Sequence, residues 1–200
     1  MNRRLAPTLV KGTLLASVVA VLTMKAYAAG KAAASDLEPV RSLDLERYMG
    51  TWYEIARYPN RFERKCAGNT TATYSAMPDG RVRVENRCRL EDGSTDVAEG
   101  VARLCGPAGS PRLKVRFAPA LLSFLPPVWG DYWVIDLDRN YTLAAVSEPG
   151  RDYLWILSRT PQVEKRALDA LLARLSGQGF DVRRLVYTPQ ADPIQAQQHY

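Results

Sequence analysis

The sequence contains a single histidine, His199, which lies in a polar C-terminal segment. A serine or cysteine nucleophile normally needs an imidazole base beside it, so the usual catalytic pairs are absent. The glycines form no phosphate-binding motif, and the cysteines are not spaced as zinc ligands. We therefore expect a protein that is not an enzyme and that carries no cofactor and no metal ion.

Long apolar runs are also absent. The longest spans residues 12–24, whereas a transmembrane helix needs about 20 apolar residues. Basic residues precede this run, and Ala26-Tyr27-Ala28 follows it as a small-x-small cleavage site. Residues 1–28 are therefore predicted to be a secretory signal peptide, with an uncleaved N-terminal anchor as the alternative. Because no cysteine lies near the cleavage site, we expect an exported protein without a lipid anchor, either free in the periplasm or associated with the outer membrane.

The positive charge of the chain comes largely from this N-terminal segment. The full sequence has 27 basic and 21 acidic residues, a net charge of +6. Four of the basic residues and none of the acidic ones lie in 1–28, which leaves 23 basic against 21 acidic residues. So small an excess argues against nucleic acid as a partner.

The rest of the chain is dominated by short segments in which apolar and polar residues alternate. The clearest runs from Arg81 to Arg89, with charged side chains at every odd position. A period of two is typical of antiparallel strands with one face enclosed and the other exposed to water. The predicted strands span 51–58, 69–76, 81–89, 96–105, 111–118, 130–136, 141–147 and 152–158. Their regular hairpins favour an all-β fold, an eight-stranded antiparallel up-and-down β-barrel, over a sandwich.

The alternation ends after the eighth strand. Thr160-Pro161 is typical of a helix start, and apolar residues then recur at helical spacing until Gly177 and Gly179. This pattern predicts one amphipathic helix that packs against the barrel, followed by a short ninth strand at 182–187. Residues 29–43 are predicted to be a flexible leader, 44–188 the barrel domain and 189–200 a disordered tail.

Three cysteines in an exported chain suggest one disulfide and one free thiol. Residues that face each other across the hairpin turn Pro78-Asp79-Gly80 should have numbers that sum to about 157, and those of Cys66 and Cys88 sum to 154; both also fall on the inward-facing parity of their strands. Cys105 falls on the outward parity of the next strand. We therefore predict a Cys66–Cys88 disulfide, with Cys105 free.

Three motifs carry a resemblance to a known family. Gly50-Thr51-Trp52 is similar to the Gly-x-Trp signature of the first lipocalin strand, Leu137 to Tyr141 to the acidic and tyrosine turn between strands six and seven, and Leu154 to Arg159 to the last-strand motif. In this order, the resemblance to lipocalins covers residues 43–188, and the segments Trp52 to Arg57, Thr71 to Ser75 and Asp152 to Pro161 resemble the bacterial lipocalin and apolipoprotein D branch in particular. The resemblance implies a hydrophobic ligand held in the barrel lumen, and lipid storage or transport at the bacterial cell envelope.

The same resemblance implies a structural role for two residues. In the family, the tryptophan of the first motif lies across the closed end of the barrel, and the arginine of the last motif packs on it. Trp52 and Arg159 are thus expected to form a cation–π plug, and neither is expected to contact the ligand.

If Trp52 points into the barrel, strand parity predicts the lining of the lumen. The predicted ligand-binding residues are Ala56, Ala72, Tyr74, Val84, Asn86, Gly100, Ala102, Leu113, Val115, Phe117, Tyr132, Val134, Tyr153 and Trp155. Several are small, which favours a cavity over a packed core. The apolar surface suits an acyl chain, and the few hydroxyl and amide groups suit a polar head. A fatty acid or a lysophospholipid is therefore the expected ligand.

The segment between strands five and six is unusually apolar for a loop. It contains Leu121, Leu122, Phe124, Leu125 and Trp129 and should lie at the open mouth of the barrel. Exposed apolar side chains in such number favour contact with a partner. We predict a portal loop that contacts membrane lipid or a second protomer, the latter giving a homodimer. The alternative is that the loop folds back and caps its own lumen.

Two other kinds of function remain open from the residues alone. One is an interaction protein whose barrel is filled by its own side chains. The other is an enzyme that acts on a lipophilic substrate, for which only Glu54 and Asp136 are expected as inward carboxylates. An inward carboxylate beside an arginine is more typical of a buried ion pair than of a general acid.

Overall fold

The computed structural model describes residues 37–123, 125 and 128–191. The predicted signal peptide at 1–28, the first part of the predicted leader and residues 192–200 of the predicted tail lie outside this range. No helix within it is long and apolar enough to span a membrane.

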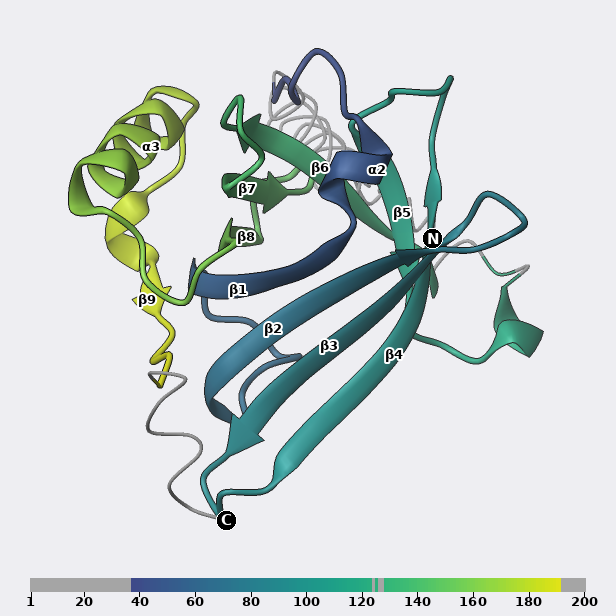
Figure 1. Ribbon diagram of the computed structural model, residues 1–200, viewed down its shortest axis with the longest axis horizontal. Coiled ribbons are helices and arrows are strands. Elements are labelled where there is room, and N and C mark those ends of the chain that lie inside the picture. Colours follow the sequence, from purple (N-terminus) through teal and green to yellow (C-terminus); the bar gives the residue numbers. More distant parts are fainter. Residues whose placement is uncertain (1–36, 124, 126–127, 192–200) are drawn as a thin grey trace, which may run out of the picture. The chain divides into compact units, whose positions relative to one another are not determined.

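Eight antiparallel strands form a closed barrel, as the sequence predicted (Figure 1). They are β1 (Gly50–Arg57), β2 (Cys66–Ala76), β3 (Val82–Leu90), β4 (Thr95–Leu104), β5 (Arg112–Arg116), β6 (Gly130–Leu137), β7 (Leu143–Ser147) and β8 (Leu154–Ser158). Each strand pairs with the next, and β1 pairs with both β2 and β8, which closes the barrel. The alternating sequence of β3 places Val82, Val84 and Cys88 inside and exposes Arg83 and Arg87, which is why this segment forms a barrel strand.

Buried side chains form two clusters, one on each face of the barrel wall. The inner cluster contains Trp52, Tyr74, Val84, Leu113, Val134, Val146 and Leu157, together with residues of the N-terminal segment. The outer cluster joins β1, β6, β7 and β8 to the helix α3 (Lys165–Gly177) through Ile55, Ile135, Ala145, Ile156, Leu171 and Leu175. The predicted helix thus packs on the outside of the barrel, beside β7 and β8 in Figure 1.

The helix begins later than the sequence pattern predicted. Its N-cap is Glu164, whose carboxylate accepts hydrogen bonds from the backbone N–H groups of Arg166 and Ala167, both at 2.8 Å. Thr160 does not cap it, because the Thr160 hydroxyl donates to the carbonyl of Gln162 within the preceding turn. The prediction that the helix starts at Thr160-Pro161 was therefore wrong, since a later side chain satisfies the free N–H groups.

The last part of the predicted flexible leader, residues 37–43, is folded against the barrel. Leu37 and Leu43 are buried against the barrel, and the N–H of Val40 donates to the carbonyl of Val134. A short helix, α2 (Leu45–Tyr48), follows. Burial of these apolar side chains stabilises the packed conformation, so residues 37–43 belong to the folded domain.

The C-terminal segment fills a gap in the barrel wall. β1 pairs with β2 only as far as Tyr53, and beyond the bulge its Ala56 and Arg57 pair with β9 (Val186–Tyr187). A 3₁₀ helix at Val182–Arg184 precedes β9, so only the end of the predicted 182–187 strand is extended. Residues 189–191, predicted as disordered tail, are hydrogen bonded to β2: Pro189 accepts from the N–H of Asn69 at 2.8 Å. The backbone groups of this C-terminal segment thus form hydrogen bonds with backbone groups of β1 and β2 at the point where these two strands no longer pair with each other.

Candidate functional site

Trp52 and Arg159 close one end of the barrel. Trp52 is 0% exposed, and the Arg159 guanidinium carbon lies 4.0 Å from the centroid of its ring. The indole N–H donates to the carbonyl of Tyr48 at 2.9 Å. Arg159 also donates to the backbone carbonyls of Arg47, Met49, Thr51 and Tyr141. The contact predicted from the resemblance is present. Through these hydrogen bonds, Arg159, which follows β8, is held against the segment that leads into β1 at the closed end of the barrel.

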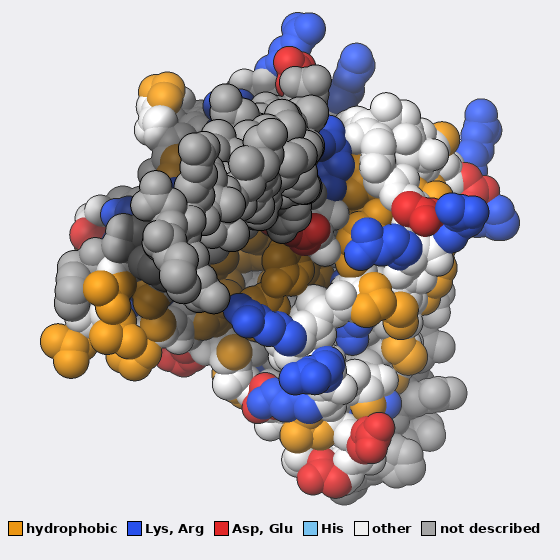
Figure 2. Space-filling view, turned by 180° about the vertical axis from the view of Figure 1, so that it is seen from behind, with side chains coloured by type: hydrophobic (Ala, Val, Ile, Leu, Met, Phe, Trp, Pro, Cys, Tyr) orange, Lys and Arg blue, Asp and Glu red, His pale blue; other side chains and the backbone are white. Residues whose placement is uncertain are grey.

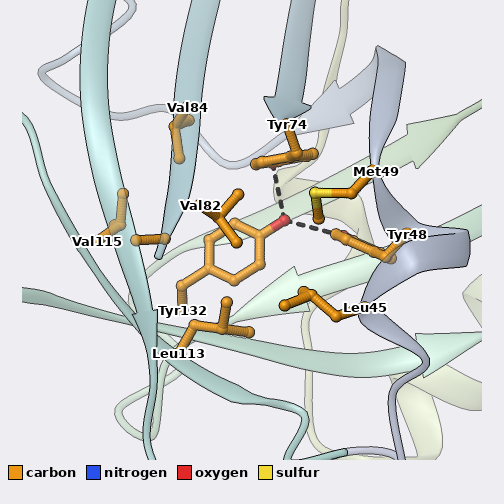
Figure 3. A pocket seen from close by; sticks show the side chains of 10 residues that line it. Leu45, Tyr48, Met49, Tyr74, Val82, Val84, Leu113, Val115 and Tyr132 are labelled. Atoms are coloured by element: carbon orange, nitrogen blue, oxygen red, sulfur yellow. Dashed lines mark hydrogen bonds between the residues drawn. The ribbon is translucent and has the colours of Figure 1, made fainter. Parts of the chain in front are cut away.

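A pocket lies inside the barrel near this end (Figure 3). Its cavity volume is about 10 Å³, which is room for about one water molecule. Six predicted lining residues surround it: Tyr74, Val84, Ala102, Leu113, Val115 and Tyr132. The other walls are Val82, which follows the same parity on β3, and Leu45, Tyr48 and Met49 at the N-terminal side. The pocket is therefore apolar apart from tyrosine hydroxyls.

Sequence reasoning missed the N-terminal wall of this pocket. Leu45, Tyr48 and Met49 stand at positions i, i+3 and i+4, and the Asp44 carboxylate accepts from the N–H of Arg47 at 3.2 Å. An N-cap residue followed by this spacing is typical of a helical turn. The signal was therefore in the sequence, but it covers a single turn and gives no sustained periodicity.

Three tyrosine hydroxyls meet in the pocket (Figure 3). The Tyr132 hydroxyl lies 2.8 Å from that of Tyr48 and 2.8 Å from that of Tyr74. Burial raises the pKa of Tyr74 to about 12 and raises the pKa values of Tyr48 and Tyr132 well above their usual range, so all three are neutral at physiological pH. Two hydrogen bonds use two of the three hydroxyl protons. Among the described residues, one O–H donor is thus left for a ligand or a water molecule.

Other predicted lining residues lie on the inner face without reaching this pocket. Val134 is part of the inner cluster, and Ala72 packs against it. A Cβ atom on Gly100 would come within 2.8 Å of the Phe117 ring, so that ring lies directly over Gly100. Phe117 is nevertheless 44% exposed. These residues line the lumen between the pocket and the open mouth.

Three more predicted residues lie nearer the open mouth of the barrel, in the part that we call the upper lumen. Asn86 is in register with Ala72 and Ala98, and its side-chain oxygen is buried without a hydrogen-bond partner in the described structure. Tyr153 stacks on Trp155 with ring centroids 5.6 Å apart. The Trp155 ring also packs against the inner cluster. This part of the lumen is thus aromatic and partly polar.

Two residues expected inside the barrel face outward instead. β-bulges interrupt the pairing of β1 with β8 between Glu54 and Ala56, and that of β6 with β7 between Val134 and Asp136. Each bulge adds one residue and reverses the alternation beyond it. Ala56 therefore packs in the outer cluster under α3, and Asp136 accepts two hydrogen bonds from Arg174 of α3 at 2.7 and 2.9 Å. The prediction that Ala56 lines the lumen was wrong.

A charged cluster lies above the pocket, on the side of the open mouth. The Nε of Arg57 is 3.2 Å from a carboxylate oxygen of Glu54 and 3.4 Å from one of Glu63. The indole N–H of Trp155 donates to Glu63 at 3.1 Å, and the Thr188 hydroxyl donates to Glu54. Burial raises the pKa of Glu54 well above its usual range, and the neighbouring Glu63 raises it further. The Arg57 guanidinium thus forms ion pairs with two carboxyl groups.

Within the described residues, no three His, Cys, Asp or Glu side chains are grouped as metal ligands.

The loop between β5 and β6 is held against the outside of the barrel. The guanidinium carbons of Arg103 and Arg116 lie over the Trp129 ring, at 4.3 and 5.3 Å from its centroid. These arginines have the opposite parity to the lumen-facing Ala102 and Val115. Leu121 is 81% exposed, and Leu122 and Leu125 are also exposed; Phe124 lies outside the described residues. The described leucines are therefore open to solvent.

The predicted disulfide is confirmed. Cys66 and Cys88 are joined by an S–S bond of 2.00 Å, and Cys105 is free. The bond links the start of β2 to the end of β3, on the side of the barrel opposite the Trp52 plug. It holds the two strands together where β2 separates from β1.

The face in Figure 2 is hollowed near its centre, with hydrophobic walls and several lysine and arginine side chains at the edge of the hollow. A hollow with these walls presents a surface that matches a ligand with an apolar body.

Comparison with known proteins places these features in context. The chain matches a family described as a lipocalin-like domain over residues 43–190. It is 42% identical to temperature-induced lipocalin-1 of Arabidopsis thaliana over 78% of this chain and 84% of that one, and 43% identical to outer membrane lipoprotein Blc of Escherichia coli (strain K12) over 76% and 81%. It is 30% identical to mouse apolipoprotein D over 76% of this chain and 79% of that one. Insecticyanin from Manduca sexta is structurally similar, with a TM-score of 0.62 at 22% identity over 78% of this chain and 86% of that one.

Proposed function

This chain belongs to the lipocalin family, and on that basis we propose that it binds one fatty acid or lysophospholipid in its lumen, for storage or transport at the cell envelope. The observation that carries the proposal is the internal pocket, whose walls are apolar except for the hydroxyls of Tyr48, Tyr74 and Tyr132. An acyl chain would bury its methylene groups against such walls, at about 0.8 kcal/mol each.

Two observations support a place in the cell envelope. The similar Blc proteins are named outer membrane lipoproteins. The Cys66–Cys88 disulfide is consistent with an oxidising compartment, and the bacterial periplasm is one. Export would agree with the signal peptide predicted at residues 1–28.

Filling the pocket with a large side chain is expected to abolish ligand binding. Ala102 lines the pocket, so Ala102→Trp would place an indole where the ligand lies. Native mass spectrometry of the purified protein should show bound lipid in the wild type and none in the variant, and affinity for a fluorescent acyl probe should fall by about tenfold or more. Val97→Trp is the matched control, since Val97 lies on the exposed outer face of β4. Equal lipid retention by the Ala102 variant would contradict a lumen site.

The exposed leucines of the β5–β6 loop are proposed to contact a membrane surface. Burying one leucine side chain stabilises an association by roughly 1.5–3 kcal/mol, so replacing Leu121, Leu122 and Leu125 with serine should reduce vesicle binding by about 100-fold or more. Flotation with phosphatidylethanolamine–phosphatidylglycerol vesicles measures this. Isoleucine at the same three positions is the control, because it keeps the apolar area. Unchanged flotation of the serine variant would eliminate the membrane contact.

A filled barrel that acts as an interaction protein is the second candidate. It is favoured by the size of the pocket: its cavity volume is about 10 Å³, room for about one water molecule, whereas ligand sites commonly have about 300–1,000 Å³. An empty protein that also fails to bind acyl probes would select this function over lipid binding. A lipid found in the purified protein would exclude it.

A further inference from the structure

The upper lumen holds polar groups that the apolar pocket does not use. Glu54 has the same parity as Trp52 and is 2% exposed; Thr70 has the same parity as Tyr74 and is 6% exposed. The two residues are neighbours across the seam between β1 and β2, because the side-chain amide of Gln190 donates to the backbone carbonyls of both, at 2.8 and 2.9 Å. Both side chains therefore face the same part of the lumen.

Carboxyl groups outnumber guanidinium groups in this part of the lumen, and several of its polar atoms lack a partner. The Thr70 hydroxyl, the side-chain oxygen of Asn86 and the Nε of Arg57 are buried without a hydrogen-bond partner in the described structure. Glu54 and Glu63 add two carboxyl groups, against the single guanidinium of Arg57. A buried acceptor without a donor costs about 1–3 kcal/mol, so a ligand that supplies donors would recover this energy. Carboxylate heads carry no donor when ionised and would add to the negative charge.

The charge of the cluster depends on one proton. The titratable groups that face Glu54 are Arg57 and Glu63, and Thr188 contributes only a hydroxyl. Burial and Glu63 raise the pKa of Glu54, so its proton is retained as the pH rises above the usual range for a carboxyl group. A cation bound beside Glu54 would favour the ionised form, and binding would release the proton.

We propose that Glu54, Glu63 and Thr70 form a headgroup site that selects single-chain amphiphiles with a protonated amine over those with a carboxylate. This inference rests on the proposed function, because it requires an amphiphile in the lumen, and it narrows that function from a fatty acid or lysophospholipid to a lysophospholipid whose head carries an amine. The alkyl chain lies toward the tyrosine pocket and the ammonium group lies against the carboxyl pair. Glu63 and Thr70 determine specificity, and Arg57 keeps the cluster from carrying two uncompensated charges.

The test compares dodecylamine with dodecanoate, which have the same chain length and opposite charge. Each competes with the neutral fluorescent probe N-phenyl-1-naphthylamine for the full-length protein at about pH 7.5. Dodecylamine should bind about tenfold or more tightly than dodecanoate. Glu63→Gln should reduce this ratio to about unity, and Thr70→Val should weaken amine binding with little effect on dodecanoate. Glu99→Gln is the control, since Glu99 pairs with Arg83 on the outer face of β4 and is well exposed.

The pH dependence gives a second, independent readout. Dodecylamine stays protonated below a pH of about 10, so only the protein changes its charge over the interval above the usual titration range of a carboxyl group, where Glu54 loses its proton. Because amine binding releases the Glu54 proton, amine affinity should rise with pH over this interval, whereas dodecanoate affinity should fall. Glu54→Gln removes the titrating group and should make the amine curve flat. The glutamine still accepts the hydrogen bond of Thr188.

Each outcome decides one claim. Equal affinities, a preference for dodecanoate, or a ratio unaffected by both Glu63→Gln and Thr70→Val would overturn the headgroup site and leave the proposed function standing. If neither amphiphile displaces the probe and the probe itself does not bind, the proposed function fails, and the headgroup site fails with it.

Discussion

Replacing Trp52 with alanine is expected to lower the free energy of unfolding by roughly 3–5 kcal/mol. The Trp52 ring is fully buried, so its removal leaves a cavity at the closed end. Its loss also removes the surface under the Arg159 guanidinium and the ring contact with Tyr48, whose centroid lies 4.9 Å away. The carbonyl of Tyr48 loses the indole N–H as a donor. Urea unfolding followed by circular dichroism measures the change.

Two further variants make this prediction specific. Trp52→Phe keeps an aromatic face under Arg159 but cannot donate to Tyr48, and it should lose roughly half as much stability as the alanine variant. Phe62→Ala is the control for removal of an aromatic ring, because Phe62 is largely exposed, and it should change stability by less than about 1 kcal/mol. A Trp52→Ala protein as stable as the Phe62 variant would show that the plug does not stabilise the barrel.

Removing the disulfide is the second change with a large expected effect. The Cys66→Ser, Cys88→Ser double variant should lose roughly 3 kcal/mol, because the bond closes a loop with a sequence separation of 22 residues and restricts the unfolded chain. Cys88 is also buried, so the serine places a hydroxyl in an apolar setting. The midpoint of urea unfolding should fall, with the slope of the transition changed by the less restricted unfolded state.

The free cysteine supplies the control for this experiment. Cys105 takes no part in the bond, so Cys105→Ser should leave stability within about 0.5 kcal/mol of the wild type. Wild-type protein unfolded in the presence of a reductant should match the double variant. If the double variant unfolds at the same urea concentration as the wild type, the disulfide is dispensable for the stability of the folded domain.

Local sequence patterns predicted the architecture because inward and outward side chains alternate along each barrel strand. This alternation can be recognised even when the ends of the strand are misplaced by a residue or two. Arg81 to Arg89 alternates so regularly that β3 and its inward face follow directly. The hairpin turn between β2 and β3 placed Cys66 near Cys88, and the disulfide followed from that register. The three family motifs predicted the contact between Trp52 and Arg159, although 107 positions separate the two residues.

The assignment of individual lumen residues was less secure where the register changes. Parity counted from Trp52 holds until the bulge after Glu54, and beyond it Ala56 faces α3. The same happens at Asp136, which pairs with Arg174 of the helix. A bulge sets two residues of one strand opposite one residue of its partner, so the residues of one strand alone do not reveal it.

By itself, then, the sequence determined the barrel, its disulfide, its outer helix and the general apolar character of its lumen, because alternation, turn residues and motif order are local properties. Only the tertiary structure decided how the barrel is closed. The α2 residues that line the pocket, the C-terminal segment that fills the seam between β1 and β2, and the grouping of Glu54, Glu63 and Thr70 all join residues distant in the chain. Such contacts form because buried backbone and side-chain polar groups need hydrogen-bond partners where two strands separate. Which residue supplies the partner depends on what the fold brings close, and not on distance along the chain.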